Sequence, residues 1–358
     1  MRLAHLAALA PLCPVCRSRS GTLAPLEFGP VARREEDTLL EGVLLCPHPE
    51  CRREYPILDG IPILVPELAG WVNANLLPLF AREDLSPELE SLIGDASGPA
   101  SAFDALRQGL SVYGWSHWGD LDPETASLPG PPADSGLVPL LERGLALAGA
   151  IPPGPALDLG CALGRASFEL ARSLEGPVLG LDLSASFLRR AAGILRNGVV
   201  DYPRRRVGLV YQRRRFAVAL PQPPRVDFWA ADAAYLPLPD ASAALVVALN
   251  LLDSTPDPRA VLREISRVLA PGGKALLASP YDWSATATPL GSWLGGHSQR
   301  GEHRGESEPI LRWLLGEGAS GGSGLRPRAE ESALPWRLRL HERSSVEYSV
   351  HLLVAEKA

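Results

Sequence analysis

Residues 154–174 read GPALDLGCALGRASFELARSL and decide the fold. Residues 156–159 form a short apolar run that Asp158 alone interrupts, as in a buried strand, and a stretch with helical spacing of apolar residues follows Gly164. Between the two, Gly160 and Gly164 permit a tight turn and the close approach of a ligand, because glycine has no Cβ. The stretch therefore predicts a strand, a ligand-binding turn and a helix in succession.

The spacing of these glycines excludes the dinucleotide-binding turn. That turn needs G-x-G-x-x-G to hold a pyrophosphate, whereas here the glycines stand four apart and an acidic residue precedes them. The pattern resembles motif I of class I S-adenosylmethionine-dependent methyltransferases. The resemblance implies a turn that holds the amino acid part of the donor, with Asp158 organising the loop or meeting the ligand's ammonium group. The donor-binding residues expected here are Asp158, Gly160, Cys161, Ala162, Gly164 and Arg165.

Two further strand-and-helix units follow at the spacing of crossover connections. Residues 176–192, GPVLGLDLSASFLRRAA, predict a strand that ends at Asp182 and a helix that Ser184 caps. A carboxylate at the end of this second strand can accept hydrogen bonds from both ribose hydroxyls. Asp232 follows a third strand and could bind the adenine amino group, although each Asp taken alone could be a cap or turn residue. The donor-binding residues expected in these later units are Asp182, Leu183, Asp232, Ala233 and Asn250.

The rest of the chain completes an α/β pattern. Residues 244–249 predict a buried strand, and residues 257–283 predict a helix, a Pro-Gly-Gly turn and another strand. Two late runs, residues 336–343 and 345–356, predict a hairpin. The expected fold is a Rossmann-like, seven-stranded methyltransferase sheet with an antiparallel last strand, preceded by a small N-terminal domain. No structure is predicted for residues 286–335.

Composition narrows the range of partners. Hydrophobic residues make up 46% and charged residues 21% of the chain, which is typical of a folded globular protein. The formal net charge of -6 lacks the basic field that phosphate backbones attract, so nucleic acid is not the favoured partner. No apolar stretch approaches the roughly 20 residues of a membrane helix, and no convincing signal peptide is present, so we expect a cytoplasmic protein without a membrane partner. The oligomeric state is left open.

Two cysteine pairs near the N-terminus predict a structural zinc site. They are Cys13-Pro-Val-Cys16 and Cys46-Pro-His-Pro-Glu-Cys51, and each pair can form a knuckle that supplies two of four tetrahedral thiolates. Disulfides are the alternative, but they are rare in cytosolic proteins. His48 lies inside the longer second spacer and could replace a cysteine as a ligand, with Cys51 favoured.

The segment around these cysteines resembles a known zinc ribbon. CPVC, LLCPHPEC and YPILDGIPILVPE, within residues 10–67, are similar to the zinc-ribbon activator subunit of tRNA, rRNA and release-factor methyltransferases. The resemblance implies a built-in scaffold without chemistry of its own, and a folding module without a regulatory role is the alternative. We therefore expect a zinc-ribbon domain at residues 1–67, a helical and loop linker at 68–135, and the methyltransferase domain at 136–358.

The methyltransferase segment resembles one family in more detail. DLGCALGRASFELAR, GLDLSASFLRRA, ALNLLDSTPDP, LAPGGKALLASPYDW and SWLGGH are similar to the C-terminal methyltransferase domain of ovothiol synthase, and so is SVYGWSHWG just before it. The resemblance covers most of residues 110–358 and implies N-methylation of the imidazole of a thiol-bearing histidine. The oxidative sulfur-transfer portion of ovothiol synthase is absent here, and a zinc ribbon stands in its place. That departure leaves the acceptor open among small nucleophiles.

Catalytic candidates follow from position in the expected sheet. Methyl transfer from a sulfonium needs alignment and desolvation, with a general base where the acceptor is protonated. Each candidate could instead be structural, and the aromatic residues of 111–120 could be either core packing or a lid over the site. The candidates after the fourth and fifth strands are Asn250, Asp253, Tyr281 and Asp282, and those from flanking segments are Tyr113, His117 and His297.

Two other functions remain open from the sequence. Residues 204–215, RRRVGLVYQRRR, could be an anion-binding strip, which together with the ribbon would suit an RNA or protein methyltransferase. Such a basic run is more often a solvated insertion loop, and no NPPY-like motif follows the fourth strand. A donor-binding module that has lost catalysis is the other alternative.

Overall fold

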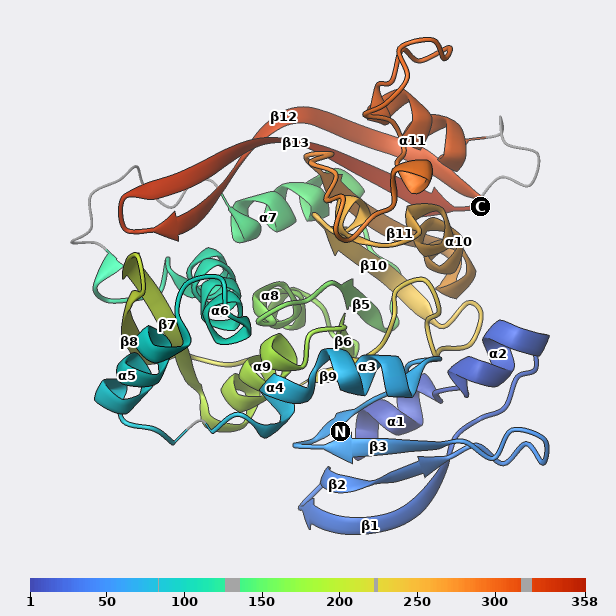
Figure 1. Ribbon diagram of the computed structural model, residues 1–358. Helices are drawn as coiled ribbons and strands as arrows, with labels where there is room; N and C mark the ends of the chain where they lie inside the picture. The colour runs from blue at the N-terminus through green and yellow to red at the C-terminus, as the bar shows by residue number, and fades with distance from the viewer. Residues whose placement is uncertain (83, 126–135, 222–224, 317–323) are drawn as a thin grey trace.

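A mixed seven-stranded sheet forms the centre of the molecule (Figure 1). The computed structural model describes residues 1–358 except 83, 126–135, 222–224 and 317–323. In the strand order β12-β13-β11-β10-β5-β6-β9, the strands from β11 to β9 run parallel and β13 is antiparallel to β11, which confirms the predicted Rossmann-like fold. The strands are β5 (Ala156–Leu159), β6 (Val178–Asp182), β9 (Val226–Ala230), β10 (Ala243–Leu249), β11 (Leu269–Ser279), β12 (Leu325–His341) and β13 (Ser344–Lys357).

Alternation along the strands divides the interior into two cores, one on each face of the sheet. In β5, Leu157 and Leu159 belong to one core and Ala156 to the other, as the two-residue period of a strand requires. The face of Ala156 is covered by α7 (Leu137–Ala148), α8 (Arg165–Ser173) and α9 (Ala185–Asn197). The opposite face is covered by α10 (Pro258–Val268), α11 (Ser307–Leu315) and the cysteine module.

The cysteine module packs directly on the main sheet. Its four-stranded sheet has the order β1-β2-β3-β4, and its cysteines share one hydrophobic core with β5, β6 and α10. Ile63 forms a parallel bridge with Ala230, and Leu64 N–H donates to Ala230 O at 2.8 Å, so the module also pairs with the edge of β9. The module contains α1 (Leu3–Leu9), α2 (Pro14–Ser20), β1 (Glu27–Glu35), β2 (Thr38–Leu45), β3 (Glu54–Leu58) and β4 (Ile61–Pro62).

The predicted linker at 68–135 is mostly helical where it is described. SGPAS, at residues 97–101, connects two helices, and Ser101 caps the second by accepting from Asp104 N–H at 3.1 Å. That second helix contacts α8, α9 and β12, so it is part of the core layer. LPGPPADSG lies almost entirely outside the described residues. The helices are α3 (Leu68–Ala74), α4 (Leu76–Phe80), α5 (Pro87–Ser97) and α6 (Ala102–Trp118).

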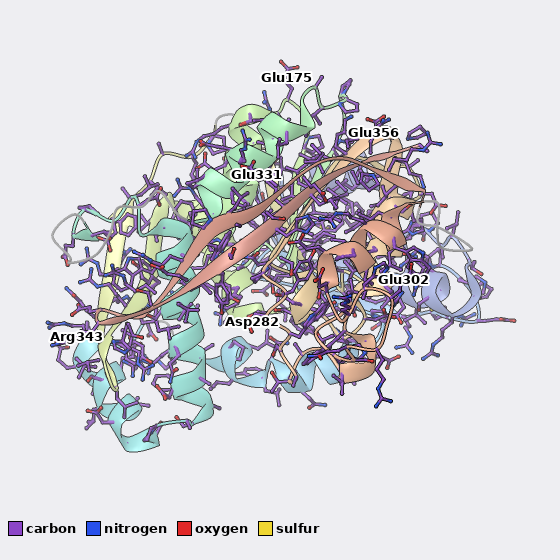
Figure 2. All side chains as sticks on the ribbon, turned by 90° about the horizontal axis from the view of Figure 1, so that it is seen from above. Glu175, Asp282, Glu302, Glu331, Arg343 and Glu356 are labelled. Carbon is purple, nitrogen blue, oxygen red and sulfur yellow. The ribbon has the colours of Figure 1, made fainter. Side chains whose placement is uncertain are left out.

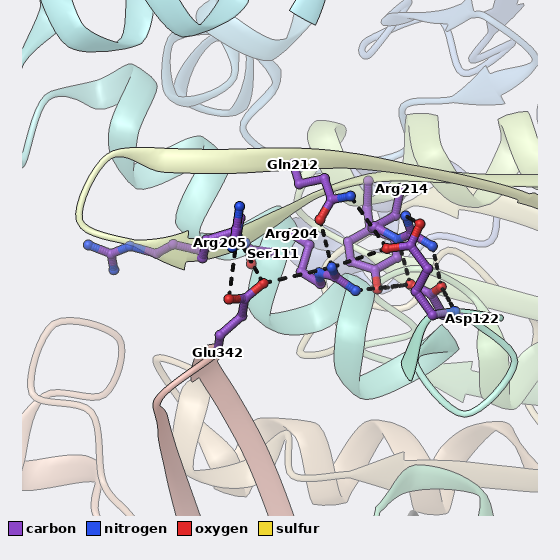
Figure 3. A network of polar contacts seen from close by, with 10 residues as sticks. Ser111, Asp122, Arg204, Arg205, Gln212, Arg214 and Glu342 are labelled. Atoms are coloured by element: carbon purple, nitrogen blue, oxygen red, sulfur yellow. Dashed lines mark hydrogen bonds and ion pairs between the residues drawn. The ribbon is translucent and has the colours of Figure 1, made fainter. Parts of the chain in front are cut away.

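The arginine-rich run at 204–215 is a β-hairpin, which corrects the expectation of a solvated loop or an open anion-binding strip. It belongs to β7 (Val199–Val207) and β8 (Val210–Ala217). Arg204 and Arg214 are buried and point at Asp122 (Figure 3). Alternation explains the difference, because every second arginine of a strand faces inward.

Asp122 is the centre of this buried network. Its carboxylate accepts from Arg214 Nε at 2.8 Å and Nη2 at 2.5 Å, and from Tyr202 Oη at 3.3 Å. Burial alone raises the pKa of Asp122, but the hydrogen bonds from Arg214 and from Glu124 N–H hold that pKa below its ordinary value. Glu342, at the tip of the β12–β13 hairpin, adds an ion pair to Arg204 at 3.7 Å. The network therefore ties three separate segments together.

Replacing Asp122 by Asn should lower the free energy of unfolding by about 3–5 kcal/mol, because two buried guanidinium groups lose their anion. Urea unfolding at pH 7 would measure the difference. Asp84→Asn is the matched control, since Asp84 is exposed and pairs with the exposed Arg82, and little change is expected there. In the unchanged chain the contribution of Asp122 is fully present above about pH 4 and is lost as the pH falls through its depressed folded-state pKa. Equal unfolding curves for both variants would contradict this role.

The C-terminal hairpin is longer than predicted. The sequence indicated strands at 336–343 and 345–356, whereas β12 begins at Leu325 and β13 ends at Lys357. Seen from above, the hairpin crosses the molecule, and Arg343 at its tip lies beside the β7–β8 hairpin (Figure 2). The predicted Pro-Gly-Gly turn is a bulge inside β11, where the register with β10 shifts. None of the described helices has the length and apolar character needed to cross a membrane.

Candidate functional site

A cavity opens at the carboxyl ends of β5, β6 and β10. Its volume is about 210 Å³, somewhat below the roughly 300–1,000 Å³ of typical small-molecule sites. In open α/β sheets this edge is where ligands bind. The predicted site residues that line the cavity are Tyr113, His117, Asp158, Gly160, Cys161, Ala162, Asp182 and Asn250.

Asp182 connects the two turns that form the floor of the cavity. Its Oδ2 accepts from Ala162 N–H at 2.9 Å, in the turn after β5, and its Oδ1 accepts from Ser184 N–H at 2.8 Å, after β6. Burial raises its pKa although these backbone donors lower it. Each carboxylate oxygen keeps a second lone pair, so Asp182 can still accept two ligand hydroxyls. Ser184 caps α9 as predicted.

Asp158 is buried at the end of β5 and binds the following helix. Ser167 Oγ on α8 donates to Asp158 Oδ2 at 2.6 Å. Burial raises the pKa of Asp158 to about 6, against the lowering effect of Ser167, and the nearby charge of Asp182 raises it further. Two carboxylates at one end of a cavity favour a ligand that carries positive charge.

The two glycines of the turn have different roles. Both have positive φ, +72° at Gly160 and +79° at Gly164. Gly160 lines the cavity, whereas a Cβ on Gly164 would lie 2.6 Å from the Cζ atom of Phe228 in β9. Gly164 is therefore required for packing of the turn against β9, whether or not a ligand is bound.

Asn250 and Tyr281 follow β10 and β11 in a strained backbone conformation, with φ of +54° and +55°. Asn250 N–H donates to Ala278 O at 2.8 Å, which fixes the residue between the two strands. Its side-chain Oδ1 is buried and has no hydrogen-bond partner among the described residues. A ligand donor at the cavity would satisfy that oxygen.

Several residues predicted to bind the donor do not line this cavity. Arg165 forms ion pairs with Asp120 at 2.8 Å and Glu169 at 2.7 Å. Leu183 is exposed, and its carbonyl accepts from Trp71 Nε1 at 2.8 Å. The other two residues of this group are Asp232 and the half-buried Ala233, and Asp232 Oδ1 accepts from Ala234 N–H at 2.9 Å. Donor binding by these four residues stays a prediction.

Tyr113 and His117 extend from α6 over the cavity. Tyr113 packs on Phe187 with ring centroids 4.9 Å apart. Burial and the neighbouring Arg165 lower the pKa of His117 to about 3, so its imidazole is neutral at physiological pH. Arg165 N–H donates to His117 Nδ1 at 3.4 Å, which leaves Nε2 as the N–H donor of the ring.

The other catalytic candidates, which follow β10 and β11, are not among the residues that line the cavity. Asp253 is buried in η2 (Leu252–Ser254), its Oδ2 accepts from Asp282 N–H at 2.9 Å, and burial raises its pKa to about 6. Tyr281 is turned to His351 on β13, with Tyr281 Oη and His351 Nδ1 2.7 Å apart. His297 is exposed, and its Nδ1 lies 3.0 Å from Gly295 O. Of these residues, Asp253 is the one adjacent in sequence to a residue that lines the cavity, Ser254.

Sequence reasoning missed Trp336 and Leu338, which reach the cavity from β12. The signal was present, since residues two apart in a strand share a face and WRLRLHER was predicted to be a strand. The sequence could not show which face of that strand would meet the donor site.

The four predicted metal ligands come together. All four Sγ atoms of Cys13, Cys16, Cys46 and Cys51 lie within 4.8 Å of one another. The Cys13–Cys51 and Cys16–Cys46 sulfurs are 3.7 and 3.6 Å apart, too far for a disulfide of about 2 Å. Four sulfurs about 2.3 Å from a tetrahedral centre would be about 3.8 Å apart, so the donor set fits zinc. The alternative ligand His48 lies outside this cluster.

Comparison with known proteins places the central residues in one family. Residues 157–277 match the family described as Methyltransferase domain. Two curated relatives are 27-O-demethylrifamycin SV methyltransferase of Amycolatopsis mediterranei, 32% identical over 38% of this chain and 40% of that one, and malonyl-[acyl-carrier protein] O-methyltransferase of Alcanivorax borkumensis, 36% identical over 43% and 42%. A solved SAM-dependent methyltransferase of Methanosarcina mazei is 21% identical over 62% of this chain and 98% of that one, with a TM-score of 0.40. The chain thus spans less than half the length of these two curated relatives, and it contains a class I S-adenosylmethionine-dependent methyltransferase domain.

Proposed function

We propose that this protein binds S-adenosylmethionine in the cavity described above and transfers its methyl group to a small acceptor molecule. The observation that carries the proposal is Asp182, which joins the turns after β5 and β6 and retains free lone pairs toward the cavity. The bound donor supplies an electrophilic methyl group on a sulfonium. The residues of the chain align the donor with the acceptor, exclude water from both, and neutralise the donor's positive charge.

The charges around the cavity support this donor. Its lining includes Asp158 and Asp182 but no Lys or Arg among the described residues. S-adenosylmethionine brings a sulfonium and an ammonium group, which two buried carboxylates would stabilise together with the Asn250 oxygen, which has no partner among the described residues. A nucleotide with several phosphates would be repelled by the same carboxylates.

The roof of the cavity favours a small acceptor. Tyr113 and His117 from α6 and Trp336 and Leu338 from β12 line it, so an acceptor must enter between two structural elements. An imidazole such as that of histidine or thiol-histidine suits this aromatic surface and is the acceptor we propose. His117 would donate a hydrogen bond from Nε2 and position the acceptor.

Asp253 is the group we assign to proton removal, because it is buried next to the cavity-lining residue Ser254 and would act on the acceptor through an intervening hydrogen-bonded group. Since burial raises its pKa to about 6, it can take a proton near neutral pH and is ionised there. We expect kcat to rise about tenfold per pH unit below pH 6 and to level off above it, because only the ionised form accepts a proton. In Asp253→Asn this dependence should disappear together with most of the activity. A pH profile of the variant with the same inflection would exclude Asp253 as the base.

An RNA or protein acceptor remains the second candidate, favoured by the close packing of the cysteine module on the sheet. The buried pairing of Arg204 and Arg214 removes two charges from the strip that would have bound phosphates. The third candidate function is a module that binds the donor without catalysing methyl transfer.

One experiment distinguishes the three functions. The chain would be titrated calorimetrically with S-adenosylhomocysteine and then incubated with labelled donor and thiol-histidine, histidine or total tRNA. Micromolar binding and a mass gain of one methyl on an imidazole compound are expected. Methylation of RNA alone would favour the second function, and binding without turnover the third. Absence of binding would remove the methyltransferase proposal.

A further inference from the structure

Residues 231–240, here called the 231–240 loop, form most of the connection between β9 and β10 and link the candidate adenine-binding residue Asp232 to the cysteine module. At its start, Ala231 N–H donates to Asp182 O at 3.2 Å, and Asp232 O accepts from Tyr235 N–H at 2.9 Å. Asp232 is therefore held in a tight turn only four residues before Leu236.

Glu264 on α10 binds the far end of this loop and the cysteine module at once. Its Oε2 accepts from Leu236 N–H at 2.8 Å. Arg17 donates to the same carboxylate through both terminal nitrogens, Nη1 to Oε1 at 3.1 Å and Nη2 to Oε2 at 2.7 Å. The side chains of Arg17 and Glu264 are each only 10% exposed, so water cannot readily replace this pair.

Two further contacts hold the same stretch of backbone. Arg267 donates to Leu236 O at 3.1 Å and to Leu238 O at 2.8 Å, and it also bonds Glu264. From the cysteine module, Leu12 N–H donates to Pro237 O at 2.9 Å. Leu236 and Leu238 are fully buried in the core that the module's cysteines share. The loop is thus fixed jointly by the sheet domain and by the cysteine module.

Arg17 follows the metal-ligand candidate Cys16 directly, on the short helix α2. The knuckle of Cys13 and Cys16 therefore sets where the Arg17 guanidinium lies. The Nε atom of Arg17 is buried without a partner among the described residues. Such a group is retained at some cost in stability, which favours a role in positioning.

We propose that the Arg17–Glu264 ion pair is a positioning latch. It holds the 231–240 loop so that Asp232 can bind the nucleoside half of the donor, and it makes donor affinity depend on the cysteine module. The inference rests on the proposed function, because it assumes that the cavity binds S-adenosylmethionine. Arg17 acts here through the loop and does not touch the ligand.

The test compares two matched substitutions on α2. Arg17→Lys keeps the charge but cannot form the bidentate pair, and Arg19→Lys is the control, since Arg19 is exposed and forms an ion pair with the exposed Glu67. Calorimetry would give the Kd of two probes, S-adenosylhomocysteine and methylthioadenosine, which carries only the nucleoside half. We expect Arg17→Lys to raise both Kd values by about three- to thirtyfold at unchanged zinc content, with no effect of Arg19→Lys.

Glu264→Gln weakens the same contact from its other partner and is expected to raise both Kd values as well. The latch would be overturned if Arg17→Lys bound both probes like the wild type. A weaker affinity for S-adenosylhomocysteine alone would also overturn it, because the effect must reach the nucleoside, and so would a loss of zinc from Arg17→Lys. If the wild-type chain bound neither probe, the proposed function itself would fail.

Discussion

Replacing Asp182 by Ala is expected to abolish detectable binding of S-adenosylhomocysteine, with at least a hundredfold increase in Kd. The carboxylate accepts from Ala162 N–H and Ser184 N–H, so its loss leaves two backbone donors unpaired and frees both turns of the cavity floor. Two ligand hydroxyls would also lose a charged acceptor, and each such bond contributes about 1.5–3 kcal/mol. Isothermal titration measures the change.

Two variants make that result specific to the carboxylate. Asp182→Asn keeps the shape and one acceptor oxygen, so its affinity should fall between those of Asp182→Ala and the wild type. Asp95→Ala, on the exposed side of α5, controls for the loss of one negative charge and should bind as the wild type does. If Asp182→Ala bound the ligand within twofold of the wild type, the donor site would have to lie elsewhere.

Removal of one cysteine thiolate should be the most destabilising single change in the N-terminal module. Cys16→Ser is expected to reduce bound zinc to nearly none and to lower the free energy of unfolding by more than about 3 kcal/mol. The reason is that the binding free energy of a structural zinc, about 10–16 kcal/mol in small peptides, is also folding free energy. Metal analysis and urea unfolding would measure both effects.

The matched control is Cys161→Ser, because Cys161 is buried but lies outside the cysteine cluster. It should retain the metal, since it contributes no ligand. The destabilisation of Cys16→Ser should spread beyond residues 1–67, because the module shares its core with β5, β6 and α10. Unchanged unfolding of a zinc-free chain would show that the four thiols need no metal to hold the module.

Several residues that the sequence predicted to bind the donor line one cavity, because the features that bring them there are local. The strand ending at Leu159, the turn with Gly160 and the cap at Ser184 depend on neighbours a few residues away. Asp182 is at the end of a strand, and the carboxyl ends of parallel strands meet at one edge of a sheet. The cysteine cluster could also be predicted from the sequence, since each of its two knuckles supplies two ligands.

The roof of the cavity and the buried arginines could not be read in the same way. The periodicity of WRLRLHER and RRRVGLVYQRRR indicates two faces for each strand but not which partner covers them. Asp122 is 80 residues from Tyr202 in β7 and 92 residues from Arg214 in β8, and no local pattern indicates that they meet.

The sequence by itself therefore determined the class of fold, the glycine-containing turn between β5 and α8, and the cysteine cluster, because these features follow from local periodicity and short-range spacing. Only the tertiary structure decided that Trp336 lines the cavity, that Arg204 and Arg214 are buried, and that Arg17 pairs with Glu264. The physical reason is that each of these contacts joins segments far apart in the chain, and their meeting depends on the packing of whole layers.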